Sequence, residues 1–182
     1  PDRIALYSLA VVPWIKPAQK LFKDEDLPKG KEKRRLYEIS RNYLLDKGYV
    51  EIGMDHFALP TDTLAVADKK GELHRNFMGY VELRTQVMLG MGVSSISETP
   101  DCFHQNEKAL PVYERRFRAD EIPTLRDHKL SDQDQLRREQ ILQFMTQGSV
   151  ALDSVDHQEL VARQLTEMIE DGLVQVSDNK MK

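Results

Sequence analysis

The order of the apolar segments near the start of the chain constrains the fold most. Arg3–Val12 is an almost continuous apolar run bounded by Pro13, which predicts a strand covered on both faces. Lys31–Lys47 has apolar residues at helical spacing, and Gly48 favours a helix end there. The next segment, Tyr49–Gly53, alternates as a short strand does. Strand, helix and strand joined by a long crossover are typical of a parallel α/β unit. The apolar face expected for the helix consists of Leu36, Ile39, Tyr43 and Leu44.

The middle of the chain carries local signals. Thr61 or Asp62 can cap a short helix that runs through Asp68 and closes at Gly71. His74–Tyr80 has no hydrophobic period, and we predict a loop that presents its side chains. We predict a turn region with two glycines over Gly90–Ile96 and a helix over Asn106–Arg118.

The last third predicts helices and part of a hairpin. Ser131 and Asp134 resemble a capping box at the start of one helix. Val155–Asp171 repeats the helical spacing, and Gly172 ends it. Leu173–Val176 then begins a strand followed by a Ser-Asp-Asn turn. Two helices followed by half a hairpin predict a winged-helix unit without its second wing strand.

Composition excludes several classes of function. The 26 basic and 30 acidic residues leave a net charge of −4, and the expected recognition helix of the winged unit is acidic, so we predict no nucleic-acid partner. No apolar stretch approaches the ~20 residues of a membrane helix, and no signal peptide opens the chain. Cys102 is the one cysteine, so neither an internal disulfide nor a cysteine-held cluster is possible. The five histidines lack metal-site spacing, and no metal site is predicted. We expect a cytoplasmic protein without a membrane partner.

Three places carry candidate chemistry, each with an ordinary alternative. Asp55 and His56 follow a predicted strand, where α/β proteins place working residues, but His56 can equally satisfy backbone groups in a turn. The segment Arg75–Tyr80 combines a cation, an amide and two aromatic rings that suit a flat anionic ligand, or that merely attach a loop to the core. Gly90 and Gly92 allow either backbone approach to a ligand or tight packing.

Three stretches together resemble one family. They are GYVEIGMDHFA at residues 48–58, LHRNFMGY at residues 73–80 and LGMGVSSIS at residues 89–97. The segments Asn106-Glu-Lys and Leu130-Ser-x-x-Asp extend the match over nearly the whole chain. The sequence resembles the oxygen-independent coproporphyrinogen III oxidases (dehydrogenases), a branch of the radical S-adenosylmethionine enzymes.

The resemblance implies an oxidoreductase of haem biosynthesis. A full-length member has an incomplete (β/α) barrel with a [4Fe–4S] cluster on a cysteine loop, followed by a helical C-terminal domain. It binds two S-adenosylmethionine molecules and takes electrons from a donor. It converts two propionates of coproporphyrinogen III to vinyl groups by radical oxidative decarboxylation, which gives protoporphyrinogen IX. The cofactor supplies the difficult chemistry and the protein positions it.

The resemblance also assigns cofactor contacts by position. Ala10, at the end of the first strand, falls where the family contacts the cluster-bound S-adenosylmethionine. Ile96 falls where the second S-adenosylmethionine is contacted, and Phe77 and Met78 occupy adjoining positions. We further hypothesise that Arg75 binds a carboxylate of the tetrapyrrole.

His56 is the other candidate for that carboxylate. The sequence departs from many relatives at Val11, where they have histidine, and at Val81-Glu82, where they often have two threonines. The second departure puts a charge beside the expected second cofactor site. The chain begins at Pro1, and we interpret it as a piece of a longer protein.

The expected architecture is α/β followed by mainly α. Residues 1–100 would form the last strands of a partial barrel with loops that face cofactor and substrate, and residues 101–182 a truncated, helical, winged-helix-like domain. No catalytic residue is expected in this piece, which would be inactive without the cluster-binding half. A haem-chaperone relative and a non-enzymatic interaction module are the alternatives. An uncovered first strand should also make the piece self-associate.

Overall fold

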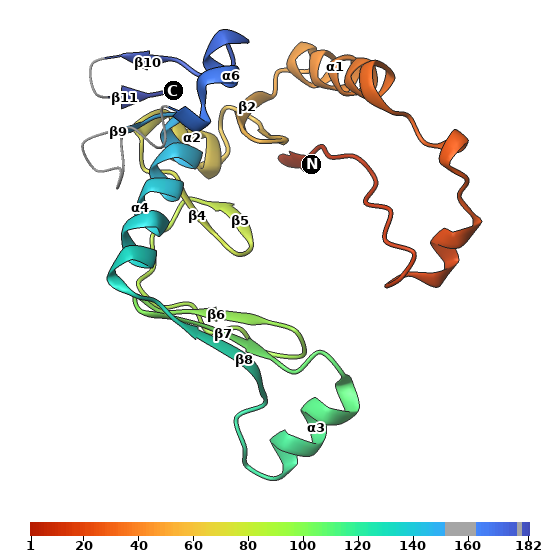
Figure 1. The fold of residues 1–182 in the computed structure, drawn as a ribbon, viewed down its shortest axis with the longest axis vertical. Helices are drawn as coiled ribbons and strands as arrows, with labels where there is room; N and C mark the ends of the chain where they lie inside the picture. The colour runs from red at the N-terminus through yellow and green to blue at the C-terminus, as the bar shows by residue number, and fades with distance from the viewer. Residues whose placement is uncertain (152–162, 178–179) are drawn as a thin grey trace. The chain divides into compact units, whose positions relative to one another are not determined.

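A computed structural model describes residues 1–151, 163–177 and 180–182 (Figure 1). The chain divides into two compact units, Pro1–Glu72 and Leu73–Lys182. The domain boundary expected at residue 100 falls inside the second unit, between two strands that are paired in one sheet.

The first unit contains a three-stranded antiparallel sheet. Its strands are β1 (Arg3–Ala5), β2 (Val50–Gly53) and β3 (His56–Ala58), in the order β1-β3-β2. The expected parallel unit is therefore wrong in its pairing, because β3 lies between β1 and β2 and is antiparallel to both. The physical cause is the tight turn at Met54-Asp55, which reverses the chain and inserts β3. Phe57 at the centre of β3 is fully buried.

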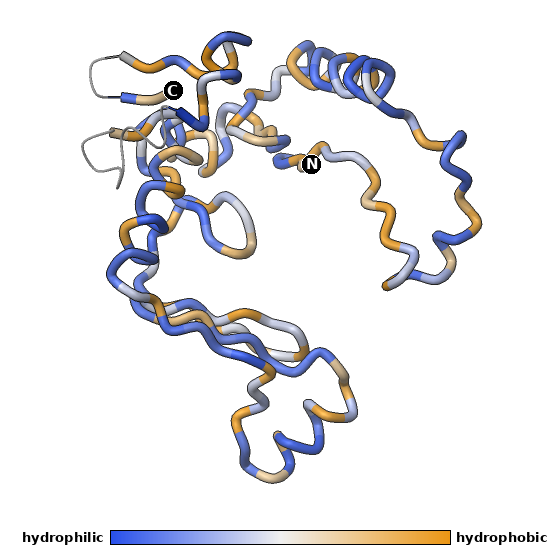
Figure 2. The backbone as a smooth tube through the Cα atoms, in the orientation of Figure 1, coloured by the Kyte–Doolittle hydropathy of each residue, from blue (hydrophilic) through white to orange (hydrophobic). Residues whose placement is uncertain are grey.

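The strand expected over Arg3–Val12 is much shorter. It ends at Ala5, and one more backbone contact, from Leu6 N–H to the carbonyl of Asp55, follows. A strand needs a partner, and β3 is only three residues long. Tyr7 and Leu9 are exposed beyond this point, in a hydrophobic stretch that runs on to the 3₁₀ helices η1 (Pro17–Leu21) and η2 (Asp24–Asp26) (Figure 2).

Helix α1 (Gly30–Asp46) confirms the expected helix to within one residue at each end. Of the apolar face expected for this helix, Leu36, Ile39 and Tyr43 are exposed and Leu44 is half-buried. The side of α1 that meets the sheet is instead polar, with Arg41 Nη2 2.7 Å from the Glu51 carboxylate on β2.

Helix α2 (Thr63–Lys70) confirms the second expected helix, with Asp62 as its cap. The Asp62 carboxylate accepts a hydrogen bond from Leu64 N–H at 2.8 Å and another from Arg3 Nε at 2.8 Å. The Arg3 hydrogen bond lowers the pKa of Asp62. Gly71 ends the helix at a φ of 71°, a left-handed conformation that glycine adopts without strain.

The second unit begins with strands where a loop was expected. Residues 74–80 form the hairpin of β4 (His74–Asn76) and β5 (Gly79–Val81), so the prediction of a loop is wrong. Three-residue strands are too short to show a period of two. The Asn76 side chain accepts from Met78 N–H at 2.8 Å and thereby closes the turn.

A second antiparallel sheet follows, in the order β6-β7-β8 (Figure 1). Its strands are β6 (Ile96–Glu98), β7 (Cys102–Asn106) and β8 (Thr124–Lys129). Asn106 is thus the last residue of a strand, and helix α3 (Leu110–Arg118) begins four residues later than expected. Strand β7 follows β6 after a short turn, but β8 comes from a segment beyond helix α3, a pairing that a local reading of the sequence does not reveal.

The end of the chain is a helix with a small sheet. Helix α4 (Asp132–Gln147) starts at the expected capping box, and Gly148 ends it. Strand β9 (Val150–Ala151) pairs with β11 (Lys180–Met181), which also pairs with β10 (Val176–Ser177). The prediction that the second strand of the closing hairpin is missing is therefore wrong. Of the helix expected over 155–171, residues 155–162 lie outside the described residues, and α6 covers Thr166–Glu170.

Candidate functional site

A cleft of about 340 Å³ lies along strands β6, β7 and β8 and includes Phe77 from the turn of the β4–β5 hairpin; we call it the sheet cleft. The strand register pairs Ile96 with Gln105, and Gln105 with Arg126. Directly opposite residues share a face of a sheet, as do residues two positions apart, so Phe103 and His128 belong to the same face. The lining residues are Phe77, Ile96, Phe103, His104, Gln105, Arg126, Asp127 and His128.

One wall of the sheet cleft is aromatic. The rings of Phe77 and Phe103 meet edge to face, with centroids 4.9 Å apart and planes at 88°. The Phe103 ring also contacts Arg138, whose guanidinium carbon lies 5.1 Å from the ring centroid. Together with Ile96, these rings form a surface on which a flat ligand group can stack.

The opposite end of the sheet cleft is polar and fixed by hydrogen bonds. Arg126 Nε donates to Gln105 Oε1 at 3.0 Å, and Gln105 Nε2 donates to the carbonyl oxygen of Ser94 at 3.1 Å. Gln105 is only 9% exposed, so it is a stable support for the exposed arginine. This chain of bonds ties the guanidinium to the backbone of the glycine loop.

The glycine loop before β6 is held from inside by Asn106. Its Nδ2 donates to Gly92 O at 2.9 Å, Ser95 Oγ at 3.0 Å and Gly90 O at 3.2 Å. Asn106 is buried, and its backbone N–H also donates to the carbonyl of Ser95. One side chain therefore sets the shape of the loop that leads into β6.

Gly90 is explained by packing. A Cβ atom at this position would lie 2.6 Å from the backbone oxygen of Ile96, closer than real side chains approach. The Gly90 N–H already donates to Ser97 Oγ at 3.0 Å. Between the two interpretations left open for this glycine, close packing beneath Ile96 is the one that the structure supports.

The β4–β5 hairpin carries an arginine with an unfilled hydrogen-bonding position. Arg75 lies opposite Tyr80, and its guanidinium carbon is 4.6 Å from the ring centroid. Tyr80 is anchored by its hydroxyl, which donates to the carbonyl of Met145 in α4 at 2.8 Å. Within the described residues, Arg75 Nη1 is the buried side-chain nitrogen that has no hydrogen-bond partner. Such a group is costly to bury, and a bound carboxylate would supply its missing acceptor.

A largely buried ion pair joins the sheet to helix α4. The Glu98 carboxylate on β6 pairs with Arg138 of α4, and Arg138 Nη1 donates to the carbonyl of Thr99 at 2.9 Å. His74 on β4 lies in the same surroundings. Burial lowers the pKa of His74, and the positive charges of Arg84 and Arg138 act in the same direction, while Glu98 opposes them.

Comparison with known proteins matches this chain to one group of enzymes. It is 40% identical over 156 residues to the oxygen-independent coproporphyrinogen III oxidase of Synechocystis, a match that covers 86% of this chain and 34% of the relative. It is 43% identical over 145 residues to the Paracoccus denitrificans oxidase of the same name, over 80% of this chain and 32% of the relative.

A solved structure agrees over the complete chain. The Escherichia coli coproporphyrinogen III oxidase HemN, described as a radical SAM enzyme, superimposes with a TM-score of 0.87 at 36% identity. The match covers 100% of this chain and 44% of the HemN chain. This chain is a homologue of the oxygen-independent coproporphyrinogen III oxidases. It spans about a third of the length of the curated relatives, and no model of a known protein family matches it.

Phe77 and Ile96, two residues singled out by resemblance to these oxidases, line the sheet cleft together. Met78 shares the hairpin turn with Phe77 and is 84% exposed. Arg75 lies in the same hairpin, two residues before Phe77. The second unit therefore gathers these four residues of the oxidase homologue in one hairpin and the adjoining sheet.

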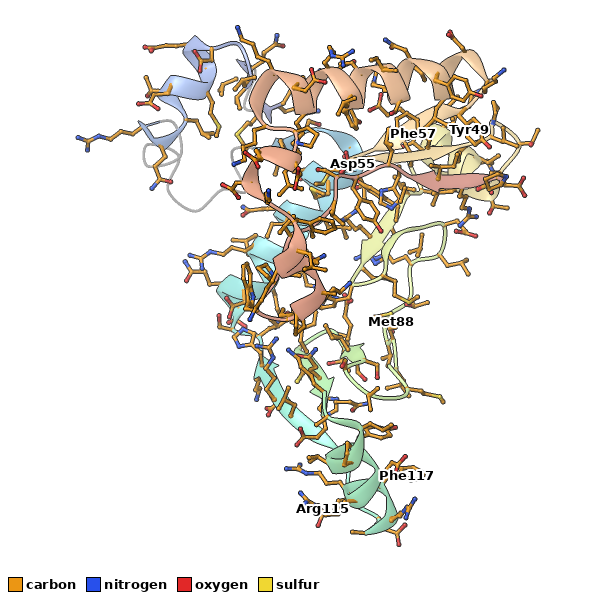
Figure 3. The ribbon with its side chains drawn as sticks, turned by 90° about the vertical axis from the view of Figure 1, so that its right-hand side faces the viewer. Tyr49, Asp55, Phe57, Met88, Arg115 and Phe117 are labelled. Atoms are coloured by element: carbon orange, nitrogen blue, oxygen red, sulfur yellow. The ribbon has the colours of Figure 1, made fainter. Side chains whose placement is uncertain are left out.

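Ala10 and His56 lie in the first unit of the oxidase homologue. The segment after β1 is held by Gln19, whose Nε2 donates to the Ala10 carbonyl at 3.1 Å. His56 Nδ1 lies 2.8 Å from the Met54 carbonyl oxygen, in the turn where Met54 and Asp55 have φ values of 22° and 56°. Figure 3 shows Asp55 and Phe57 on this hairpin. The hydrogen bond agrees with the alternative in which His56 satisfies a backbone group.

Sequence reasoning missed six of the eight residues that line the sheet cleft, all of them on β7 and β8. Phe103, Gln105, Arg126 and His128 reach it only because β7 and β8 pair in one register. The sequence of β8, TLRDHK, has no apolar alternation, and Asn106, the last residue of β7, was expected to begin a helix. A weak signal existed in the β-favouring Cys-Phe pair before Asn106.

The residues present fit one implied cofactor and not the other. An aromatic wall and an anchored arginine suit the adenine and the carboxylate of S-adenosylmethionine. A [4Fe–4S] cluster needs several thiolates, and Cys102 is the one cysteine of the chain. In the described part of the chain, no group of three or more metal-ligating side chains gathers, and no helix is long and apolar enough to cross a membrane.

Proposed function

We propose that this chain forms part of an oxygen-independent coproporphyrinogen III oxidase. The enzyme would convert two propionates of coproporphyrinogen III to vinyl groups and yield protoporphyrinogen IX. The observation that carries the proposal is the sheet cleft, in which Phe77 and Ile96 meet. The similarity to curated oxidases and to HemN supports it.

In this proposal the sheet cleft contacts the second of two S-adenosylmethionine molecules. Phe77 and Ile96 would contact its apolar part, and Met78 would lie at the rim. Ala10, in the first unit, would contact the cluster-bound molecule. Bound to the cluster held by the rest of the enzyme, S-adenosylmethionine supplies the radical that takes hydrogen from a substrate propionate. The residues of this chain bind and orient the ligands and keep water from them.

Arg75 would bind a carboxylate of the tetrapyrrole, with His56 as the second candidate. The buried Nη1 without an acceptor supports the choice of Arg75. Tyr80 holds the guanidinium plane in place, so little conformational freedom is lost when a carboxylate binds. Arg75→Ala in the full-length gene product should weaken substrate affinity, and an unchanged affinity would remove this role.

The architecture that we propose for the enzyme is a partial barrel, to which the first unit contributes strands, followed by a winged-helix-like end formed by α4, β9 and the β10–β11 hairpin. We propose a cytoplasmic enzyme with an electron donor as its protein partner, and without nucleic-acid or membrane partners. The net charge of −4 supports the absence of a nucleic-acid partner.

The test uses the natural full-length gene product purified without oxygen. We expect about four iron and four sulfide per chain, the content of one cubane cluster, and formation of protoporphyrinogen IX from coproporphyrinogen III. Ile96→Asp, which puts a charge into the sheet cleft, should abolish product formation while the iron content stays. Ile122→Asp, at an exposed position outside the cleft, is the matched control and should remain active.

Each contrary result has a definite meaning. An enzyme that carries the cluster and binds haem, but releases no carbon dioxide, would be a haem-delivery protein. A gene product without iron would be a binding module. Full activity of the Ile96→Asp variant would show that the sheet cleft takes no part in the reaction.

A further inference from the structure

We infer that Arg126 is a carboxylate-binding residue at the polar end of the sheet cleft. This inference rests on the proposed function and names the group by which that site recognises its ligand. The ligand class is a molecule with an apolar, largely flat body and a carboxylate.

The geometry prepares the guanidinium for this task. Its Nε is engaged by Gln105, and Gln105 is engaged by the Ser94 carbonyl, so one edge of the guanidinium is anchored. A guanidinium has a second edge, formed by its two Nη atoms, that matches the two oxygens of a carboxylate. Anchoring one edge lowers the entropy lost when the other edge binds a ligand.

Arg126 also differs in its electrostatic surroundings from two other arginines of the second unit. Arg138 is paired with Glu98, and Arg116 lies 3.3 Å from the Glu107 carboxylate. In the described part of the chain, Arg126 has no carboxylate within 4.0 Å. Its sequence neighbour Asp127 also lines the sheet cleft, but successive strand residues alternate between faces, and Asp127 forms no ion pair with Arg126 within 4.0 Å. The positive charge is therefore available to a ligand.

The strand register places Arg126 in line with the apolar contact. Ile96, Gln105 and Arg126 are opposite one another on three adjacent strands, and strand spacing puts Ile96 and Arg126 about 10 Å apart. A ligand that stacks near Ile96 and Phe103 can thus reach Arg126 with a carboxylate at its end. His128 lies two residues further along the same face.

Two sources can provide this carboxylate. One is the amino-acid carboxylate of S-adenosylmethionine, and the other is a propionate of the tetrapyrrole. The chemistry recognised is the same, and paired probes distinguish the sources. Equilibrium binding to the full-length gene product is measured with S-adenosylmethionine against 5′-methylthioadenosine, and with coproporphyrin III against its tetramethyl ester.

Arg126→Gln should weaken binding of at least one carboxylate probe by about 10-fold or more, the usual loss for a charge-assisted hydrogen bond. The carboxylate-free member of that pair should bind as before. A selective loss for S-adenosylmethionine identifies the cofactor as the source, and a selective loss for coproporphyrin III identifies the substrate. Arg126→Lys, which keeps the charge without the fork, should show an intermediate loss.

Arg118→Gln is the control, since Arg118 is exposed on α3 and lies 3.5 Å from Glu114. Three results would overturn the inference. Arg126→Gln could weaken binding of both members of each probe pair equally, or weaken neither, or the wild-type protein could bind the carboxylate probes no better than their carboxylate-free partners. If the wild-type protein is an active oxidase and Arg126→Gln binds both carboxylate probes as tightly as the wild type, only the inference about Arg126 is refuted. A wild-type protein without oxidase activity, but with the selective loss, refutes the proposed function alone.

Discussion

Replacing Arg138 by alanine should destabilise the second unit more than any surface substitution. The Glu98 carboxylate is 10% exposed and the Arg138 side chain 29% exposed, so the variant leaves a nearly buried charge without its cation. Removing one partner of a buried pair costs about 3–5 kcal/mol, and the partial exposure of Arg138 places the expected loss near the lower limit, at about 3 kcal/mol. The hydrogen bond to Thr99 O and the contact with Phe103 are lost as well.

For a chain of this size, about 3 kcal/mol corresponds to a fall in Tm of roughly 6–12 °C. The fall is measured by far-ultraviolet circular dichroism during thermal unfolding, because Trp14 lies in the first unit and would report on the wrong part of the chain. Hydrogen exchange at β6 and α4 should show the same loss of protection. Glu98→Asp, which keeps the charge, is a milder companion variant.

The double variant Glu98→Gln/Arg138→Met separates the two possible causes. If the loss arises from an unpaired buried charge, the double variant should recover most of the stability, to within about 1–2 kcal/mol of the wild type. A double variant as unstable as Arg138→Ala, or a single variant that loses less than about 1 kcal/mol, would refute the electrostatic explanation.

Four further outcomes are expected. The pKa of His74 is lowered in the folded chain, so the unfolded chain binds more protons below pH 6.5. The contribution of His74 to the free energy of unfolding should be complete above pH 6.5 and should fall as the pH falls below it. Urea titrations at several pH values should show a weaker pH dependence of this free energy for His74→Gln. Burial raises the pKa of Asp68 near the end of α2, so Asp68→Asn should stabilise at pH 7 by about 0.5 kcal/mol, with the gain vanishing below pH 3.8, as thermal melts at the two pH values can show. Gly90→Ala should cost about 1–3 kcal/mol in urea titrations, since its Cβ has no room. Finally, light scattering should detect self-association of this chain, and Tyr7→Ser and Leu9→Ser should reduce it. A wild-type chain that is monomeric would contradict the prediction that the exposed apolar segment drives self-association.

Helix positions were predictable because their signals are local. Asp62 and Gly71 mark the ends of α2, and the reciprocal bonds of Ser131 and Asp134 mark the start of α4. A cap acts over three or four residues of chain, so the pattern that forms it is visible in the sequence alone. Phe77 and Ile96 stand in the motifs that resemble the oxidase family and both line the sheet cleft, while their contact with a cofactor stays a prediction.

The pairing of short strands was decided by tertiary structure. Residues 96–98, 102–106 and 124–129 form one sheet although each segment is too short, or too polar, to show a clear period. The same holds for β3, which separates two strands expected to be neighbours. The pairs β1–β3 and β7–β8 join segments that are distant in the sequence, and only the folded chain brings these partners together.

The sequence by itself determined helices α1, α2 and α4, the caps of α2 and α4, the family resemblance and the presence of a single cysteine. Tertiary structure alone decided that Phe103, Gln105 and Arg126 share one face with Ile96, because a register shift of a single residue would turn them to the opposite face. It also decided that the apolar stripe of α1 is exposed, since burial depends on which element lies against a helix and not on the helix itself.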